Sequence, residues 1–370
     1  MKELEFIETI KKTLSKNSYI GDDCAYLKDL GIVITQDSLV EDIHFSRKFS
    51  TPYQLAYKAI IVNLSDIFAS GALPKYITIA LSLPENIDKN FISEFYGACE
   101  DLSKEFKFEI VGGDITGAEK CFISICAIGL TKGRNISSRK YAKVGDYVIT
   151  TGVHGSSAAG LWLLKKRMWK NPKNDSFLRF FKSDLGSART HTSYGIAGGM
   201  GASRTREIAR KIRNFSASSN NISKYPNLIK AHLTPTIQKD FSDEISTKVN
   251  RNYAMMDTSD GLMDAVFKIA QASDVSISLD FNKIPYDKEI EDVAKSANVN
   301  FEDWIFYGGE DYQLIACVDG ENLKKLSVPY TIIGQVEKKN KNNCVEIVFN
   351  DKTEKIDNLE KTFNHFKGGK

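Results

Sequence analysis

Short acidic motifs recur along this chain of 370 residues, and each follows an apolar run or opens a helical pattern. So many carboxylates can share a site only if cations neutralise their mutual repulsion. Mg²⁺ does this with oxygen ligands and keeps positions open for phosphate oxygens. The pattern therefore predicts a metal-dependent enzyme that handles phosphoryl groups. The motifs lie at residues 21–27 (GDDCAYL), 35–45 (TQDSLVEDIHF), 63–66 (NLSD), 112–114 (GGD), 256–262 (MDTSDGL) and 308–312 (GGEDY).

Each motif alone would be weak support for a metal site. Gly-Asp and Ser-Asp-Gly are ordinary turn sequences, and an acid such as Asp260 at a helix start is also favoured by the helix dipole. The ensemble favours the metal, because the aspartates all follow apolar runs or lie on a helix face predicted to be buried. They are Asp23, Asp37, Asp66, Asp114, Asp257 and Asp260.

A nucleotide would have to be held without the common phosphate-binding loops. The chain has no GxxxxGK[ST] motif and no kinase-type GxGxxG with its lysine. The metal ions, the backbone amides near Gly112 and Gly113, and basic side chains such as Arg139 remain to bind it. His44 follows the second acidic motif and is either a base or a hydrogen-bonded part of the scaffold.

The elements that position these motifs are predicted by the spacing of apolar residues. Strand and helix signals alternate in both halves, which indicates an α/β (α+β) protein with some antiparallel pairing. We expect two α/β domains, residues 1–140 and 141–370. The predicted strands are 31–35, 76–83, 109–111, 121–130, 147–151, 254–256, 276–279, 313–318 and 330–334, and the predicted helices are 51–70, 89–106, 156–166 and 259–272.

The helix at 51–70 has the clearest signals. Thr51 is a preferred cap, and Pro52 is tolerated in the first turn. One face is apolar, and the other carries small and polar residues that let another segment approach closely. Asp66 lies on that second face, where a carboxylate needs a partner such as a metal ion. The helix predicted from residue 259 should likewise be capped by Ser259.

Composition narrows the class of protein. A net charge of +3 is too small to indicate nucleic acid, and no apolar run approaches the roughly 20 residues of a membrane helix. The six cysteines form no CxxC pair, which favours reduced thiols in a cytoplasmic protein. Residues 176–222 carry eight Lys or Arg and two acids in a Gly/Ser/Thr-rich context, which predicts a surface insert.

Taken together, the motifs resemble those of the thiamine-monophosphate kinase family, within the aminoimidazole-ribonucleotide-synthetase-like superfamily. The resemblance covers about 20–168 and about 225 to the C-terminus, including YKAIIVNLSDIFASGALP, IVGGDITG, IGQV and the closing TFNHF. It implies transfer of the γ-phosphate of ATP to thiamine monophosphate, giving thiamine diphosphate by direct in-line transfer with Mg²⁺. It also implies a homodimer in which strands of both N-terminal domains form a barrel, with the active site near the interface.

The resemblance also assigns roles to residues, motif by motif. Asp66 and Asp260 would be catalytic; Gly113, Asp114, Arg139, Ser259 and Tyr96 would bind ATP. His44, Glu310 and Phe363 would line the thiamine phosphate pocket. The implied metal ligands are Asp23, Thr35, Gln36, Asp37, Asp66, Asp114, Asp257 and Asp260.

The chain departs from the family pattern at three places. Gln36 stands where the family usually has Thr, Phe363 replaces a Tyr or Trp, and the insert at 176–222 is not expected. Two alternatives stay open: a superfamily synthetase with another substrate, against which the closing TFNHF argues, and a non-catalytic nucleotide- or metal-binding protein, against which the intact carboxylates argue.

Overall fold

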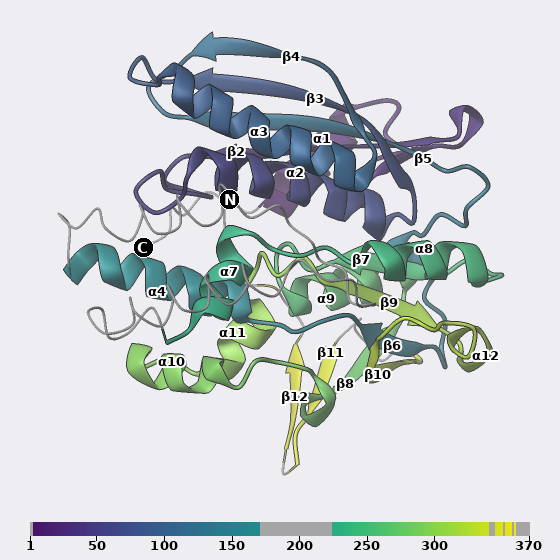
Figure 1. Ribbon diagram of the computed structural model, residues 1–370. Coiled ribbons are helices and arrows are strands. Elements are labelled where there is room, and N and C mark those ends of the chain that lie inside the picture. The colour runs from purple at the N-terminus through teal and green to yellow at the C-terminus, as the bar shows by residue number, and fades with distance from the viewer. Residues whose placement is uncertain (1–2, 171–223, 340–344, 351, 357–358, 360–370) are drawn as a thin grey trace, which may run out of the picture.

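The computed structural model describes residues 3–170, 224–339, 345–350, 352–356 and 359. Within these ranges the chain forms two β-sheets covered by helices (Figure 1), which confirms the predicted α/β class. The predicted insert at 176–222 and Phe363 lie outside the described residues. No described helix is both long and apolar enough to cross a membrane.

The N-terminal sheet has five strands in the order β1-β2-β5-β3-β4. All neighbours are antiparallel except β3 and β4, which run parallel. Helices α2 and α3 cover one face with a continuous apolar core, while the other face has no covering helix in the described chain. The elements are α1 (Glu3–Thr13), β1 (Ala25–Leu27), η1 (Lys28–Leu30), β2 (Ile32–Val40), α2 (Pro52–Ala69), β3 (Leu73–Leu83), α3 (Lys89–Phe106), β4 (Glu109–Gly117) and β5 (Phe122–Leu130).

The C-terminal sheet has seven strands in the order β12-β11-β8-β10-β6-β9-β7. Helix α9 packs on this sheet, and α4, α7, α10 and α11 pack on one another around a separate apolar cluster. The elements are η2 (Arg139–Tyr141), β6 (Tyr147–Thr150), α4 (Ser156–Lys170), α7 (Pro226–Leu233), α8 (Lys239–Lys248), β7 (Ala254–Asp257), α9 (Leu262–Ser273), β8 (Ser276–Asp280), η3 (Phe281–Lys283), α10 (Glu289–Ala297), α11 (Phe301–Tyr307), β9 (Leu314–Val318), α12 (Gly320–Leu323), β10 (Thr331–Glu337), β11 (Val345–Val348) and β12 (Thr353–Ile356).

Helix α2 joins the two halves of the molecule. It begins as predicted, because the Thr51 side chain accepts from the Gln54 N–H while the Gln54 side chain accepts from the Thr51 N–H. One side packs on β2, β5 and β3, and the other contacts β7 and α8 (Figure 1). Its polar residues therefore meet the C-terminal half directly.

Several predicted boundaries were wrong, and strand β2, expected at 31–35, runs on to Val40. Strand β4 was expected to end at Val111 but continues through the GGD motif to Gly117, because it pairs in parallel with β3. A Cβ on Gly113 would lie 1.9 Å from the Ile79 carbonyl oxygen, so this pairing requires glycine. Helix α9 begins at Leu262 after Gly261, and the Ser259 hydroxyl bonds Asp257 instead of capping the helix.

Candidate functional site

Three of the predicted aspartates converge between the two halves of the molecule. Asp23 precedes β1, Asp66 lies in the last turns of α2, and Asp257 ends β7. Each offers one carboxylate oxygen, and these three atoms lie within 4.8 Å of one another. The packing of α2 against β7 brings the Asp66 and Asp257 side chains together.

The three carboxylates are electrostatically unfavourable without a counterion. Burial raises the pKa of Asp66 well above its usual value, and repulsion from Asp37, Asp257 and Asp23 raises it further. Burial and repulsion from Asp23 raise the pKa of Asp257 to about 7. A divalent cation bound by oxygen ligands removes this repulsion, so the donor set fits Mg²⁺.

Hydrogen bonds hold these carboxylates in place. The Thr35 hydroxyl donates to Oδ2 of Asp66 over 2.5 Å, and the Ser65 hydroxyl donates to Oδ2 of Asp257 over 2.6 Å. The other oxygen of Asp257 accepts from the Ser259 hydroxyl at 2.9 Å. Such partners orient ligands for a metal ion.

Asp37 is placed through its backbone. Its N–H donates to the Asn63 side chain of α2 over 3.0 Å, so this part of β2 is tied to the helix that carries Asp66. The tie holds Asp37 near enough to raise the pKa of Asp66. The structure thus brings Asp37 to the neighbourhood of the aspartate cluster.

Arg139 lies beside the cluster. Its Nη2 donates to Oδ1 of Asp23 over 2.5 Å, and its backbone N–H donates to Asp22 over 2.8 Å. Burial opposes its charge, but the neighbouring Asp23 raises the pKa of Arg139 above its usual value. This guanidinium stays charged at the edge of the site, as required of a residue that binds phosphate.

Asp260 belongs to a second charged group that the sequence did not indicate in full. Lys268 Nζ lies 2.6 Å from Oδ2 of Asp264 and 3.5 Å from Oδ2 of Asp260. Burial raises the pKa of Asp264 to about 6. The signal that could have revealed part of this group is the spacing of four residues between Asp264 and Lys268, which places both on one face of α9, while Asp260 lies in the turn before the helix.

The GGEDY turn packs backbone to backbone against the turn that carries Asp260. A Cβ on Gly309 would lie 2.5 Å from the Ser259 carbonyl oxygen, and Gly261 has a φ of +105°. The Glu310 N–H donates to that same carbonyl over 2.7 Å. Glycines at these two positions allow the two acidic motifs to meet.

The predicted pocket residue His44 acts as an acceptor in the turn after β2. Its Nδ1 accepts from the Val40 N–H over 3.0 Å, and its carbonyl accepts from Lys58 Nζ over 3.2 Å. Because Nδ1 accepts this bond, the neutral ring carries its proton on Nε2, and the lone pair that a base would need is already engaged. The arrangement favours the scaffold interpretation.

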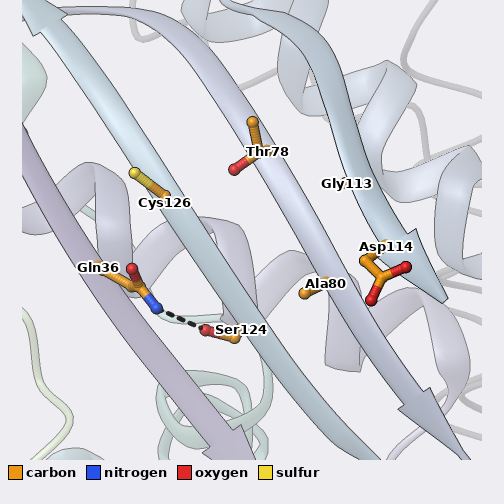
Figure 2. Close-up of a pocket in the computed structure, with 7 residues that line it drawn as sticks. All are labelled: Gln36, Thr78, Ala80, Gly113, Asp114, Ser124 and Cys126. Carbon is orange, nitrogen blue, oxygen red and sulfur yellow. Dashed lines mark hydrogen bonds between the residues drawn. The ribbon is translucent and has the colours of Figure 1, made fainter. Parts of the chain in front are cut away.

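The structure does not bring Gln36, Gly113, Asp114 and Tyr96 to the three-aspartate cluster. Figure 2 shows Gln36, Gly113 and Asp114 lining a shallow hollow on the uncovered face of the N-terminal sheet. The Gln36 side chain donates to the Ser124 hydroxyl there over 3.2 Å. It faces away from the side where Thr35 meets Asp66, because successive residues of a strand point to opposite faces of the sheet. The Gln36 side chain therefore points away from the metal cluster. Tyr96 lines an adjoining hollow along β4 with Gly113 and Asp114.

Known proteins share this sequence and architecture. Residues 21–131 match the family described as AIR synthase related protein, N-terminal domain. Thiamine-monophosphate kinase of Bacillus subtilis (strain 168) is 30% identical over 383 residues, covering 99% of this chain and 100% of that protein. The chain belongs to the thiamine-monophosphate kinase family.

Other members support the assignment to this kinase family. The Aquifex aeolicus (strain VF5) thiamine-monophosphate kinase is 31% identical, covering 90% of this chain and 91% of that protein. The solved structure of AaThiL complexed with AMPPCP and TMP is 30% identical with a TM-score of 0.70, and 96% of each chain is covered. The HypE–HypF complex, at 17% identity and a TM-score of 0.64, shares the fold alone.

Proposed function

We propose that this chain phosphorylates thiamine monophosphate with ATP, giving thiamine diphosphate and ADP. Its family membership supports this activity, and so does a relative solved with AMPPCP and TMP. The single observation that carries the proposal is the convergence of Asp23, Asp66 and Asp257 within 4.8 Å at the contact between the two halves. Carboxylates so placed suit a reaction between two phosphate-bearing substrates.

The metal-binding residues in this proposal come from both halves of the chain. Two or more Mg²⁺ ions would supply charge neutralisation between donor and acceptor phosphates. Phosphoryl transfer then asks the protein chiefly for positioning, so direct in-line transfer needs no covalent nucleophile. The proposed ligands are Asp23, Asp37, Asp66, Asp257 and Asp260, with Thr35 and the backbone of Gln36 completing the set, whereas Asp114 lies away from them on the uncovered face of the sheet.

The chain's own residues divide between the two substrates. Arg139, charged and held beside Asp23, would bind phosphate oxygens of ATP, and so would Ser259, whose hydroxyl donates to Oδ1 of Asp257. Glu310 and His44 would face thiamine monophosphate. Lys58 links these two residues, since its Nζ lies 2.6 Å from Oε1 of Glu310 and donates to the His44 carbonyl.

A homodimer completes the proposed site. Strand β4 is the outer strand of its sheet and exposes Val111 (54%) and Ile115 (63%), apolar side chains that a second copy would cover. Gly113, Asp114 and Tyr96 lie along this same strand and its hollow. We propose that residues 1–140 dimerise through this face as a barrel, and that residues 141–370 form the second domain.

A coupled assay of ADP release tests the function. Purified protein should release ADP with thiamine monophosphate and Mg²⁺, and turnover should fall to background with thiamine or aminoimidazole precursors as acceptors. Formation of thiamine diphosphate identifies the product. Turnover with an aminoimidazole precursor alone would place the chain with another superfamily activity. Binding of ATP without turnover on any acceptor would favour a non-catalytic protein.

A further inference from the structure

Three side chains from separate elements meet beside the proposed acceptor pocket. Lys58 Nζ of α2 lies 2.6 Å from Oε1 of Glu310, and Nδ1 of His232 in α7 lies 3.2 Å from Oε2. The His232 Nδ1 also lies 3.0 Å from the Ser157 hydroxyl. Side-chain exposure is 4% for Lys58, 2% for His232 and 23% for Glu310. The carboxylate is therefore the exposed end of a buried polar group.

Stability alone explains this group poorly. Burying a charged pair gains little over packing apolar side chains of the same volume. Glu310 also adopts a left-handed backbone with φ +68°, which is unfavourable for a residue with a side chain. Buried charge combined with backbone strain is typical of a site where the orientation of a side chain matters to function.

The charges around Glu310 keep its carboxylate ionised, so that it can accept hydrogen bonds. Although burial opposes ionisation, the Lys58 ammonium holds the pKa of Glu310 below its usual value. Burial lowers the pKa of His232 to about 3, so its ring is neutral, and we assign the Nδ1 proton as the one that faces Glu310. A carboxylate has about four acceptor positions. With one partner on each oxygen, positions remain for a ligand.

We propose that Lys58 and His232 are positioning residues that hold the Glu310 carboxylate as a fixed hydrogen-bond acceptor for an N–H group of the acceptor substrate. The inference rests on the proposed function, in which Glu310 faces thiamine monophosphate. Thiamine monophosphate carries an amino group on its pyrimidine ring, and such a group matches an ionised acceptor. An analogue without the N–H leaves the carboxylate desolvated and unpaired, and sites of this kind reject such analogues strongly.

Binding measurements on three variants test the Lys58 contact. Calorimetric dissociation constants for thiamine monophosphate and for AMPPCP are compared in Lys58→Met, Glu310→Gln and the double variant. A hydrogen bond to a charged group predicts about a tenfold weaker affinity for thiamine monophosphate in each single variant, with AMPPCP affinity within twofold. The double variant should bind like Glu310→Gln, because Lys58 acts through Glu310. If the two losses of affinity multiply in the double variant, Lys58 and Glu310 act independently and the proposal is wrong.

Arg251→Met is the matched control. Arg251 also pairs with carboxylates, those of Asp146 and Asp319, but on elements that carry none of the proposed site residues. It should lower the melting temperature without changing either dissociation constant. If Lys58→Met weakens both ligands equally, Lys58 supports the fold in general and the proposal is wrong.

A second series does not depend on Lys58→Met folding. His232→Asn keeps an N–H donor near the Nδ1 position and should retain thiamine monophosphate affinity within threefold, whereas His232→Leu should lose about tenfold. Equal affinities of the two variants would contradict the proposal. Thiamine monophosphate dimethylated on its amino nitrogen has no N–H to donate and should bind the wild-type protein weakly. Glu310→Gln should bind this analogue and thiamine monophosphate itself with similar dissociation constants. The inference is refuted if Glu310→Gln binds thiamine monophosphate with normal affinity. The proposed function still stands in that case, provided that the wild-type protein turns over thiamine monophosphate.

Discussion

The Ser65 hydroxyl donates a 2.6 Å hydrogen bond to Oδ2 of Asp257, a residue 192 positions later in the chain. Ser65 lies in α2 beside Asp66, and Asp257 ends β7, so the bond joins the two halves at the aspartate cluster. Both residues are buried. The position of one proposed metal ligand therefore depends on the helix that carries another.

We expect Ser65→Ala to weaken Mg²⁺ binding by about tenfold, because residues that orient a metal ligand typically contribute that much to affinity. The measurement is a Mg²⁺ titration followed by calorimetry in the presence of AMPPCP. Ser103→Ala is the control, since the Ser103 hydroxyl only donates to the carbonyl of Glu100 on the exposed side of α3. Unchanged Mg²⁺ affinity in Ser65→Ala would show that this bond serves folding alone.

Asp66→Asn and Asp260→Asn should each lower turnover about 100-fold or more, a loss of ~3 kcal/mol of transition-state stabilisation. Activity should also vanish on chelation and return with added Mg²⁺. Steady-state ADP release measures both effects, and the circular dichroism spectrum verifies that the variants are folded. Turnover near wild type in both variants would contradict the metal-cluster interpretation.

Phe363→Ala should raise the KM for thiamine monophosphate and leave the KM for ATP nearly unchanged. An aromatic ring stacked on a flat cationic heterocycle contributes roughly 0.5–2 kcal/mol. Phe363 lies outside the described residues, so the expectation rests on the resemblance alone. Equal changes in the two KM values would indicate that the C-terminal segment supports the fold and does not line the pocket.

Gly113→Ala should disrupt β4 locally, because the new Cβ would lie 1.9 Å from the Ile79 carbonyl oxygen. A backbone shift of this kind predicts a destabilisation of about 1–3 kcal/mol. Gly117→Ala, with no heavy atom within 4 Å of its Cβ, is the matched control on the same strand. Urea unfolding compares the two variants, and equal stabilities would show that the β3–β4 register is not as the structure has it.

Stability at acid pH should depend on Glu244. Although burial opposes its charge, hydrogen bonds from Lys248 and Ser327 lower the pKa of Glu244 to about 2. A depressed pKa contributes stability above the unfolded value of about 4.3 and loses it as pH falls through the folded value. The difference in melting temperature between wild type and Glu244→Gln should therefore be constant above pH 5 and shrink toward pH 2. A difference that is independent of pH would contradict this linkage.

Local signals were enough to predict several elements. Helix α3 spans the predicted residues 89–106, and α2 begins at Pro52 after the expected Thr51 cap, because capping and apolar periodicity act within a few residues. The ordered acidic motifs also indicated the family, which the relatives confirm. These are properties of short segments, so they can be read before the chain is folded.

Which acidic residues meet was decided only by tertiary packing. Asp23, Asp66 and Asp257 converge because β7 packs on α2, whereas Asp114 lies on the uncovered face of the sheet (Figure 2). Local propensity predicts that β4 ends at its Gly-Gly motif, but pairing with β3 extends the strand through it. The Lys58–Glu310–His232 group likewise joins three distant segments. Contacts between distant segments depend on how whole elements pack, and no pattern within a single segment carries that information.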